Sequence, residues 1–192
     1  LSKYYGTFGY TNNDIKFIED MIHYNNSYFS NYQNGWRDLR YSQEMIAAPS
    51  WCHASSGILL AYLETQNQLS LKFDIDWNEV SNTIIQKGFN SSHCLCHGMV
   101  GNAEALIAIG NYMNNPNLKS FVHEKILSEI QKNQNEFNWR TGFTNGRFAL
   151  NGLFLGTSGI AYNLLKIFVN PNLPSFLILQ SPILRNKKNY IS

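Results

Sequence analysis

The sequence predicts an all-α protein in which layers of helices pack on one another. Three runs of apolar residues have the length of buried helices, and each follows a segment with regularly placed small residues. More polar stretches with apolar residues at helical spacing alternate with these runs. We find no convincing β-hairpin signal in the sequence. Together these observations indicate inner and outer layers of helices.

The inner layer is predicted from three segments that resemble one another. In each, a small residue stands three places before a glycine, and an apolar run follows. The glycines are Gly57, Gly101 and Gly159, which are 44 and then 58 residues apart. A helix that is apolar on nearly all sides is covered on nearly all sides. We therefore expect inner helices to start near these glycines, where small residues allow backbones to approach closely.

The outer layer is predicted from the amphipathic segments between the apolar runs. One follows Asp76, with Glu79 three residues later, which resembles a capping box at the start of a helix. Others cover residues 15–22 and 118–130, each with an apolar stripe at helical spacing. We expect one face of each helix to meet water. An ordinary helical bundle, in which the glycines fall by chance, is the alternative interpretation.

Composition and charge exclude several classes of function. The 192 residues include 15 basic and 13 acidic side chains, so the net charge of +2 excludes an electrostatically driven nucleic-acid binder. The one basic cluster, Arg185, Lys187 and Lys188, falls in a predicted C-terminal tail, residues 183–192, where we expect it to be solvated. No transmembrane segment is expected, because no segment approaches about 18 consecutive apolar residues.

The cysteines point to a metal site. There are three, Cys52, Cys94 and Cys96, and no secretory signal, which argues against disulfides and favours a reducing, cytoplasmic location. Cys52 and the pair Cys96 and His97 occupy matching positions in neighbouring repeats, so they should meet at one end of the helices. Two sulfurs and one nitrogen suit tetrahedral zinc with an open fourth position. Buried cysteines that act as small hydrophobic residues are the alternative.

The same segments resemble the motifs of a known family, the lanthionine synthetase cyclases. Ser50-Trp-Cys-His-Ala-Ser-Ser-Gly-Ile58 resembles their WCHGxxG motif, and Leu95-Cys-His-Gly-Met-Val-Gly-Asn-Ala-Glu104 resembles CHGxxGN. Residues 152–162 and 173–179 are similar to the last glycine motif and the usual C-terminal end, and residues 24–29 and 36–40 to a segment of the class II, LanM-type synthetases. The resemblance covers nearly the whole chain and implies a LanC-like cyclase domain over residues 1–182.

This resemblance implies a fold and a reaction. The fold would be part of an α/α toroid, a double ring of inner and outer helices. By resemblance, Cys52, Cys96 and His97 bind zinc (Zn²⁺), which activates a cysteine thiol of a lanthipeptide precursor. The thiol adds to dehydroalanine or dehydrobutyrine and closes a thioether ring. His53 adjoins a ligand and is the candidate catalytic residue for protonating the enolate, with packing as its alternative role.

The sequence also departs from the family pattern. Ala54 and Ser55 stand where a glycine-containing run is usual, and no His-Gly motif of an earlier repeat occurs before Cys52. The dehydratase half of a LanM enzyme is missing as well. We therefore expect the C-terminal part of a cyclase domain, weakly active or inactive alone, with the upstream part of the synthetase as its partner. The alternatives are a non-catalytic zinc-binding or peptide-interaction remnant, and a glycan-processing α/α barrel with paired carboxylates.

Other polar residues are expected to be structural. His93 and Cys94 lie beside the site but have no ligand role in the family, and Asp38 and Arg40 should form a pair or a helix cap. His23 and His123 fall in outer segments and are expected to be solvated. A partial ring would also leave apolar faces exposed near residues 15–28 and 58–63.

Overall fold

The computed structural model describes residues 1–41, 45–90, 92–133, 138–143 and 150–181, so the expected tail, residues 183–192, lies outside it. The regular structure of the described residues is mostly helical and includes one two-stranded antiparallel sheet, which confirms the all-α class. No helix in these ranges has the length and apolar character needed to cross a membrane. The elements are α1 (Ser2–Phe8), α2 (Asn12–Asn26), β1 (Phe29–Ser30), β2 (Gly35–Trp36), α3 (Ser55–Leu69), α4 (Trp77–Lys87), α5 (Met99–Tyr112), α6 (Pro116–Lys132) and α7 (Thr157–Phe168).

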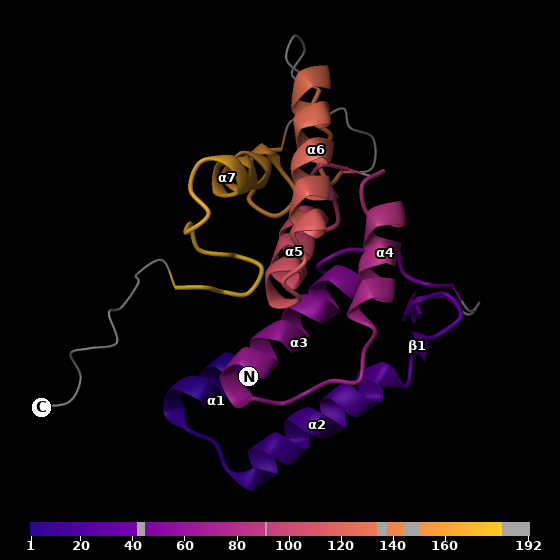
Figure 1. The fold of residues 1–192 in the computed structure, drawn as a ribbon, viewed down its shortest axis with the longest axis vertical. Helices are drawn as coiled ribbons and strands as arrows, with labels where there is room; N and C mark the ends of the chain where they lie inside the picture. Colours follow the sequence, from indigo (N-terminus) through magenta and orange to yellow (C-terminus); the bar gives the residue numbers. More distant parts are fainter. Residues whose placement is uncertain (42–44, 91, 134–137, 144–149, 182–192) are drawn as a thin grey trace, which may run out of the picture.

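Helix α5 lies at the centre and packs against α3, α4, α6 and α7 (Figure 1). Every residue from 99 to 106 is buried, as expected for an inner helix. The amphipathic helices α4 and α6 place their apolar stripes on it, and Ile84 and Ile126 are both fully buried. Asp76 caps α4, because its carboxylate accepts hydrogen bonds from the backbone N–H groups of Asn78 and Glu79.

Helix α7 is less covered than its apolar sequence predicts. Gly159, Ile160 and Asn163 are its buried residues, whereas Leu165 is 51% exposed. In the described part of the chain, α7 packs mainly against α5, so a single face is covered. The expectation of burial on nearly all sides is therefore met by α5 and is wrong for α7.

The three inner helices share one packing device. Each starts two residues before its repeat glycine, and that glycine lies against the backbone carbonyl oxygen six residues earlier. A Cβ atom would stand 1.7–2.0 Å from that oxygen, so no residue other than glycine fits. The pairs are Gly57 with Trp51, Gly101 with Leu95, and Gly159 with Leu153.

The small sheet was not expected. Phe29 pairs with Trp36, and Ser30 with Gly35. Trp36 is 3% exposed, and its ring meets Phe29 edge-on at a centroid distance of 4.8 Å. Two-residue strands are too short to show a period-two pattern, so the sequence gives no hairpin signal. The sheet anchors the segment from residue 37 to 40 near the start of α3.

The N-terminal edge differs from the expectation in one respect. The short helix α1 packs on α3, where the Ser2 and Thr65 hydroxyls lie 2.6 Å apart and Lys3 pairs with Glu64 at 3.5 Å. Leu59, Leu60 and Leu63 of the same helix are buried in the core, where α3 packs on α5. The expected exposure of residues 58–63 is wrong for these three, because α3 packs on α5 as well as on α1.

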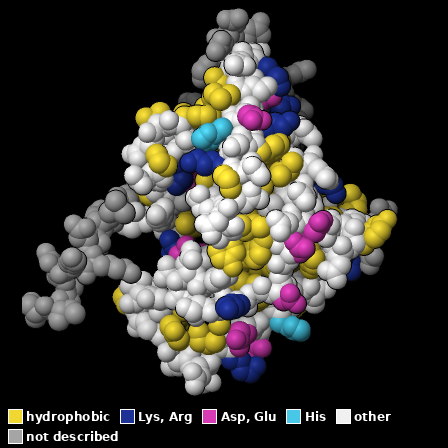
Figure 2. All heavy atoms as spheres, in the orientation of Figure 1, with side chains coloured by type: hydrophobic (Ala, Val, Ile, Leu, Met, Phe, Trp, Pro, Cys, Tyr) yellow, Lys and Arg dark blue, Asp and Glu magenta, His cyan; other side chains and the backbone are white. Residues whose placement is uncertain are grey.

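The neighbouring helices α1 and α2 do expose large apolar side chains, as expected for residues 15–28. Phe8 is 74% exposed and Phe17 is 53% exposed, and Met21 and Tyr24 are exposed as well. Figure 2 shows hydrophobic side chains at the surface in the lower part of the molecule, where Figure 1 places α1 and α2. We call this surface of exposed apolar side chains on α1 and α2 the apolar edge.

Candidate metal centre

Backbone hydrogen bonds connect the loops that precede the three inner helices. The Trp51 N–H donates to the Cys96 carbonyl, and the Cys96 N–H donates to the Phe154 carbonyl, both at 2.9 Å. The Trp51 ring also stacks on Phe154, with ring centroids 5.1 Å apart and planes 13° from parallel. Cys52, Cys96 and Phe154 stand at equivalent positions, five residues before their repeat glycines. These bonds hold the Cys52 loop directly beside Cys96.

The two cysteines and His97 form a compact cluster. The Sγ atoms of Cys52 and Cys96 and one ring nitrogen of His97 all lie within 4.8 Å of one another. Atoms that share a zinc ion at bond lengths of about 2.0–2.3 Å lie at most about 4.6 Å apart. The cluster therefore fits zinc in its donor types and, within a small adjustment, in its spacing. Cys52 is exposed and the other two are half-buried, so one side of the cluster is open.

The surroundings of Cys96 determine the protonation state of its thiol. Burial, followed by the neighbouring Cys52 thiol, raises the pKa of Cys96 to about 12. Without a cation, the thiol of Cys96 therefore keeps its proton at neutral pH. Helices α3 and α5 begin three residues after Cys52 and Cys96, and the positive ends of helix dipoles stabilise nearby anionic sulfur. A divalent cation would add to that stabilisation.

His53 lies next to the cluster in a defined orientation. Its Nδ1 atom is 2.9 Å from the Cys52 sulfur, and its Nε2 atom is 3.0 Å from a guanidinium nitrogen of Arg40. Arginine can only donate, so Nε2 accepts and Nδ1 carries the proton that faces the sulfur. Partial burial, and then the Arg40 charge, lower the pKa of His53, which keeps the imidazole neutral at pH 7.

Arg40 forms the predicted pair with Asp38. Its Nε donates to one carboxylate oxygen at 2.8 Å, and its Nη2 donates to the other at 2.5 Å. These hydrogen bonds hold the pKa of Asp38 at about 2. The sequence analysis missed that the pair reaches His53. No spacing rule could reveal it, because Arg40 and His53 are thirteen positions apart and neither belongs to a helix or strand.

Cys94 and Gly142 lie close together, and Gly142 packs against the His97 ring. Cys94 is fully buried, and its sulfur accepts a hydrogen bond from the Ser92 hydroxyl at 3.2 Å. A Cβ atom on Gly142 would lie 2.9 Å from the Cys94 sulfur and 3.0 Å from Cε1 of His97. The backbone of Gly142 therefore lies directly against the imidazole. Sequence reasoning did not find Gly142, which belongs to none of the repeat motifs.

His93 has the expected structural role. It is 2% exposed, its Nδ1 accepts a hydrogen bond from the Arg140 backbone N–H at 2.9 Å, and its Nε2 lies 3.3 Å from Glu129. It therefore ties α6 to the segment that carries Gly142.

The two histidines expected to be solvated differ. His23 is exposed, as predicted. The prediction for His123 is wrong: it is half-buried, its ring centroid lies 5.2 Å from that of Phe168, and its Nε2 is buried without a hydrogen-bond partner in the described chain. Phe168, which covers His123, belongs to α7, and the apolar pattern of α6 does not show that α7 packs beside it.

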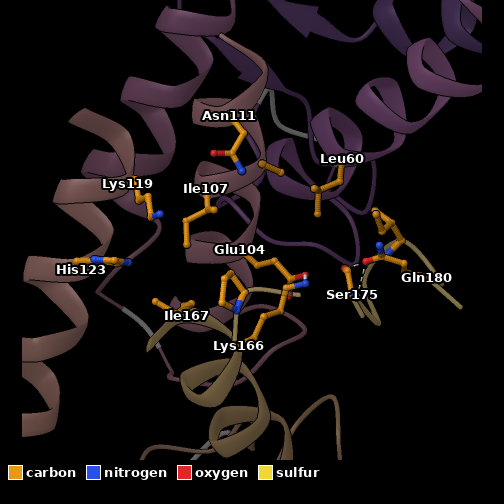
Figure 3. Close-up of a pocket in the computed structure, with 13 residues that line it drawn as sticks. Leu60, Glu104, Ile107, Asn111, Lys119, His123, Lys166, Ile167, Ser175 and Gln180 are labelled. Atoms are coloured by element: carbon orange, nitrogen blue, oxygen red, sulfur yellow. Dashed lines mark hydrogen bonds and ion pairs between the residues drawn. The ribbon is translucent and has the colours of Figure 1, made fainter. Parts of the chain in front are cut away.

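A pocket of about 230 Å³ lies between α3, α5, α6 and α7 (Figure 3). Glu104 and Lys166 face each other in it at 3.5 Å, and the Asn163 amide donates to Glu104 at 2.6 Å. Glu104 is the one acidic residue among the described residues that line it. Glycoside hydrolysis uses a pair of carboxylates, so this pocket gives no support to the glycan-processing alternative.

Comparisons with known proteins agree with these motifs. A sequence model of the family described as "Lanthionine synthetase C-like protein" matches residues 1–178. A curated relative, the lacticin 481/lactococcin biosynthesis protein LcnDR2 of Lactococcus lactis subsp. lactis, is 27% identical over 168 residues. The match covers 79% of this chain and 17% of that protein, so the chain spans a small part of the relative's length. The family match includes both cysteine motifs and all three repeats, and the chain therefore belongs to the lanthionine synthetase C-like family.

Proposed function

We propose that this chain carries the zinc centre of a lanthionine cyclase, which closes thioether rings in a lanthipeptide precursor. The observation that carries the proposal is the cluster of Cys52, Cys96 and His97, whose ligand atoms lie within 4.8 Å of one another. These residues come from the two cysteine motifs of a chain that belongs to the LanC-like family. The open side of the cluster, at the exposed Cys52, suits entry of a peptide thiol.

In this proposal Cys52, Cys96 and His97 hold the zinc ion. Zinc bound there would supply the positive charge that keeps a peptide thiol ionised at neutral pH. Hydrogen bonds between the loops hold Cys52 beside Cys96. The backbone of Gly142 limits the positions that the His97 ring can take.

The proposed reaction adds S–H across a C=C bond. The peptide thiol loses its proton, its sulfur lone pair forms the C–S bond, and the π pair moves toward the neighbouring carbonyl oxygen. The α-carbon then takes up a proton, so nothing leaves and nothing is oxidised or reduced overall. We assign this proton transfer to His53, whose neutral ring would take up the proton lost by the peptide thiol and return it to the α-carbon, because its Nδ1 lies 2.9 Å from the Cys52 sulfur.

We also propose that the active unit includes residues from the rest of a LanM-type synthetase. The chain spans 17% of the length of its curated relative, which supports an active unit larger than these residues. The substrate would be a dehydrated precursor peptide, and a reducing cytoplasm would keep the thiols available. The alternative is a zinc-binding or peptide-interaction remnant without cyclase activity.

One experiment separates these possibilities. We expect the wild-type chain and Cys94→Ala to bind one zinc ion, and Cys96→Ala to lose stoichiometric zinc. A dehydrated peptide that contains cysteine is then incubated with zinc and the chain, with and without the upstream part of the synthetase, and its free thiols are counted. We expect rapid loss of thiols only with both parts present. Equal zinc content in the wild type and Cys96→Ala would refute the metal centre, and zinc binding without any loss of thiols would favour the remnant.

A further inference from the structure

A second cavity, of about 240 Å³, lies beside the candidate metal centre. It is formed by the end of α2, by β2 and the segment after it, and by the start of α3. His53 belongs both to this cavity and to the surroundings of the cluster, because its Nδ1 lies 2.9 Å from the Cys52 sulfur. We call it the Arg40 pocket; its lining residues are Tyr24, Asn25, Tyr28, Trp36, Arg37, Asp38, Leu39, Arg40, His53 and Ile58.

The Arg40 pocket combines an aromatic side with a fixed hydrogen-bond donor. The rings of Tyr24 and Tyr28 meet edge-on with centroids 5.2 Å apart. The polar side of the pocket is formed by Arg40. Its Nε and Nη2 atoms hydrogen-bond to Asp38, and Nη2 also contacts His53. Within the described chain, its Nη1 group takes part in no hydrogen bond, and the side chain is 61% exposed. A donor held by two partners, with its remaining N–H groups open to solvent, is suited to bind an acceptor.

The charge of this pair indicates which kind of acceptor fits. The Asp38 carboxylate lies 2.5 Å from the Arg40 guanidinium and is ionised at neutral pH, because the pKa of Asp38 is held at about 2. The pair is therefore close to neutral overall, which disfavours tight binding of a carboxylate or phosphate. A neutral carbonyl group that gains negative charge during a reaction would be stabilised by the open N–H groups.

We infer that the Arg40 pocket binds the dehydroalanine or dehydrobutyrine residue of the precursor, with Arg40 Nη1 donating to that residue's carbonyl oxygen. This inference rests on the proposed cyclase function. When the thiolate sulfur bonds to the β-carbon, the π pair moves through the α-carbon toward this oxygen. Protonation of the α-carbon then restores the carbonyl, so Arg40 contacts the charge while it exists. The aromatic side of the pocket would hold the methylene or ethylidene group of this residue and its neighbours.

The test compares Arg40→Gln with Arg40→Lys and with Lys16→Gln, a matched loss of an exposed cation that pairs with Asp20 on α2. The chain, loaded with zinc, is assembled with the upstream part of the synthetase, and thiol loss is followed at several concentrations of dehydrated peptide. We expect Arg40→Gln to lower kcat by about tenfold to 10²-fold and to raise KM for the dehydrated peptide, with little change in zinc content. The kcat of Arg40→Lys should lie between those of the wild type and Arg40→Gln, and the kcat of Lys16→Gln should match the wild type.

A second measurement separates this inference from the proposed function. A peptide that keeps its dehydroalanine but has its cysteine replaced by alanine is titrated into each variant by calorimetry. We expect the wild type to bind it more tightly than the matching serine peptide, and Arg40→Gln to lose that preference. Equal rates and equal peptide preference in Arg40→Gln and Lys16→Gln would overturn the inference, as would loss of zinc in Arg40→Gln. If the wild type causes no loss of thiols, the cyclase function fails, and the titration still decides whether the pocket binds dehydrated residues.

Discussion

At the scale of single residues, the candidate metal centre depends on the absence of a side chain at Gly142. Gly142 leaves room for the His97 imidazole, because a Cβ atom would stand 3.0 Å from its Cε1 and 2.9 Å from the Cys94 sulfur. We predict that Gly142→Ala displaces the imidazole and weakens zinc binding about tenfold or more, as changes around metal ligands commonly do. Competition with a chelator of known affinity measures this.

The matched control for Gly142→Ala is Gly152→Ala. A Cβ atom on Gly152 meets nothing within 4 Å, so zinc affinity should not change. Equal zinc affinity in the two variants would show that Gly142 does not position His97.

His93 should make stability depend on pH. Burial, followed by the Arg140 charge, lowers the pKa of His93, although Glu129 acts in the opposite direction and Lys132 adds to the lowering. Below about pH 6.5, His93 therefore binds a proton more readily in the unfolded chain than in the folded chain. We predict that the free energy of unfolding falls as the pH drops from 7 to 5.5, and that His93→Gln reduces this fall. Denaturant titrations at both pH values test this, with His23→Gln, a change at an exposed residue, as control. An identical fall in the free energy of unfolding in the wild type, His93→Gln and His23→Gln would contradict the prediction.

At the scale of elements, Asn102 connects α5 to its neighbours. It is fully buried, its amide donates to the carbonyls of Pro49 at 3.1 Å and Gly88 at 2.7 Å, and its oxygen accepts from Ser56 at 2.6 Å. Asn102→Ala would leave these buried groups without partners, so we predict a loss of about 3 kcal/mol in the free energy of unfolding. Ser56→Ala removes one bond and should cost about 1 kcal/mol.

Denaturant unfolding of Asn102→Ala, Ser56→Ala and the exposed Asn117→Ala measures these costs. Asn117→Ala should be close to neutral. If Asn102→Ala were as stable as Asn117→Ala, the buried network would not be what holds α5 to the loop before α3.

The elements that the sequence predicted well are those with a strong local signal. The inner helices begin within two residues of their expected glycines, and Asp76 caps α4 as its spacing indicates. The cluster of Cys52, Cys96 and His97 was also predicted, because matching positions in repeats become neighbours when the repeats stack. Its role as a zinc site stays a prediction.

The features that the sequence did not reveal depend on contacts between distant segments. Helix α1 packs on α3 through residues more than sixty positions apart, and Arg40 reaches His53 although neither residue lies in a helix or strand. Gly142 acts on His97 through space alone. None of these contacts follows from hydrophobic period or motif spacing, which describe neighbours along one element.

At the scale of the whole molecule, the apolar edge formed by α1 and α2 should drive association. Phe8 and Phe17 are 74% and 53% exposed, and large exposed apolar patches favour contact with other protein surfaces. We predict that the isolated chain self-associates at micromolar concentration, and that the double variant Phe8→Ser, Phe17→Ser shifts it toward monomer. Sedimentation velocity measures the distribution. Val169→Ser, a change at a 72% exposed residue after α7, is the control, and an equal shift from it would contradict the assignment to this edge.

The hydrogen bonds that join the three loops also determine when the centre can form during folding. Trp51 bonds to a carbonyl 45 residues away, and Cys96 to one 58 residues away. Closing such long segments costs entropy that is recovered only after the helices between them have packed. The ligand cluster is therefore a late product of folding. Metal that binds there can slow the opening of the finished structure, but it cannot guide the first steps of the chain toward it.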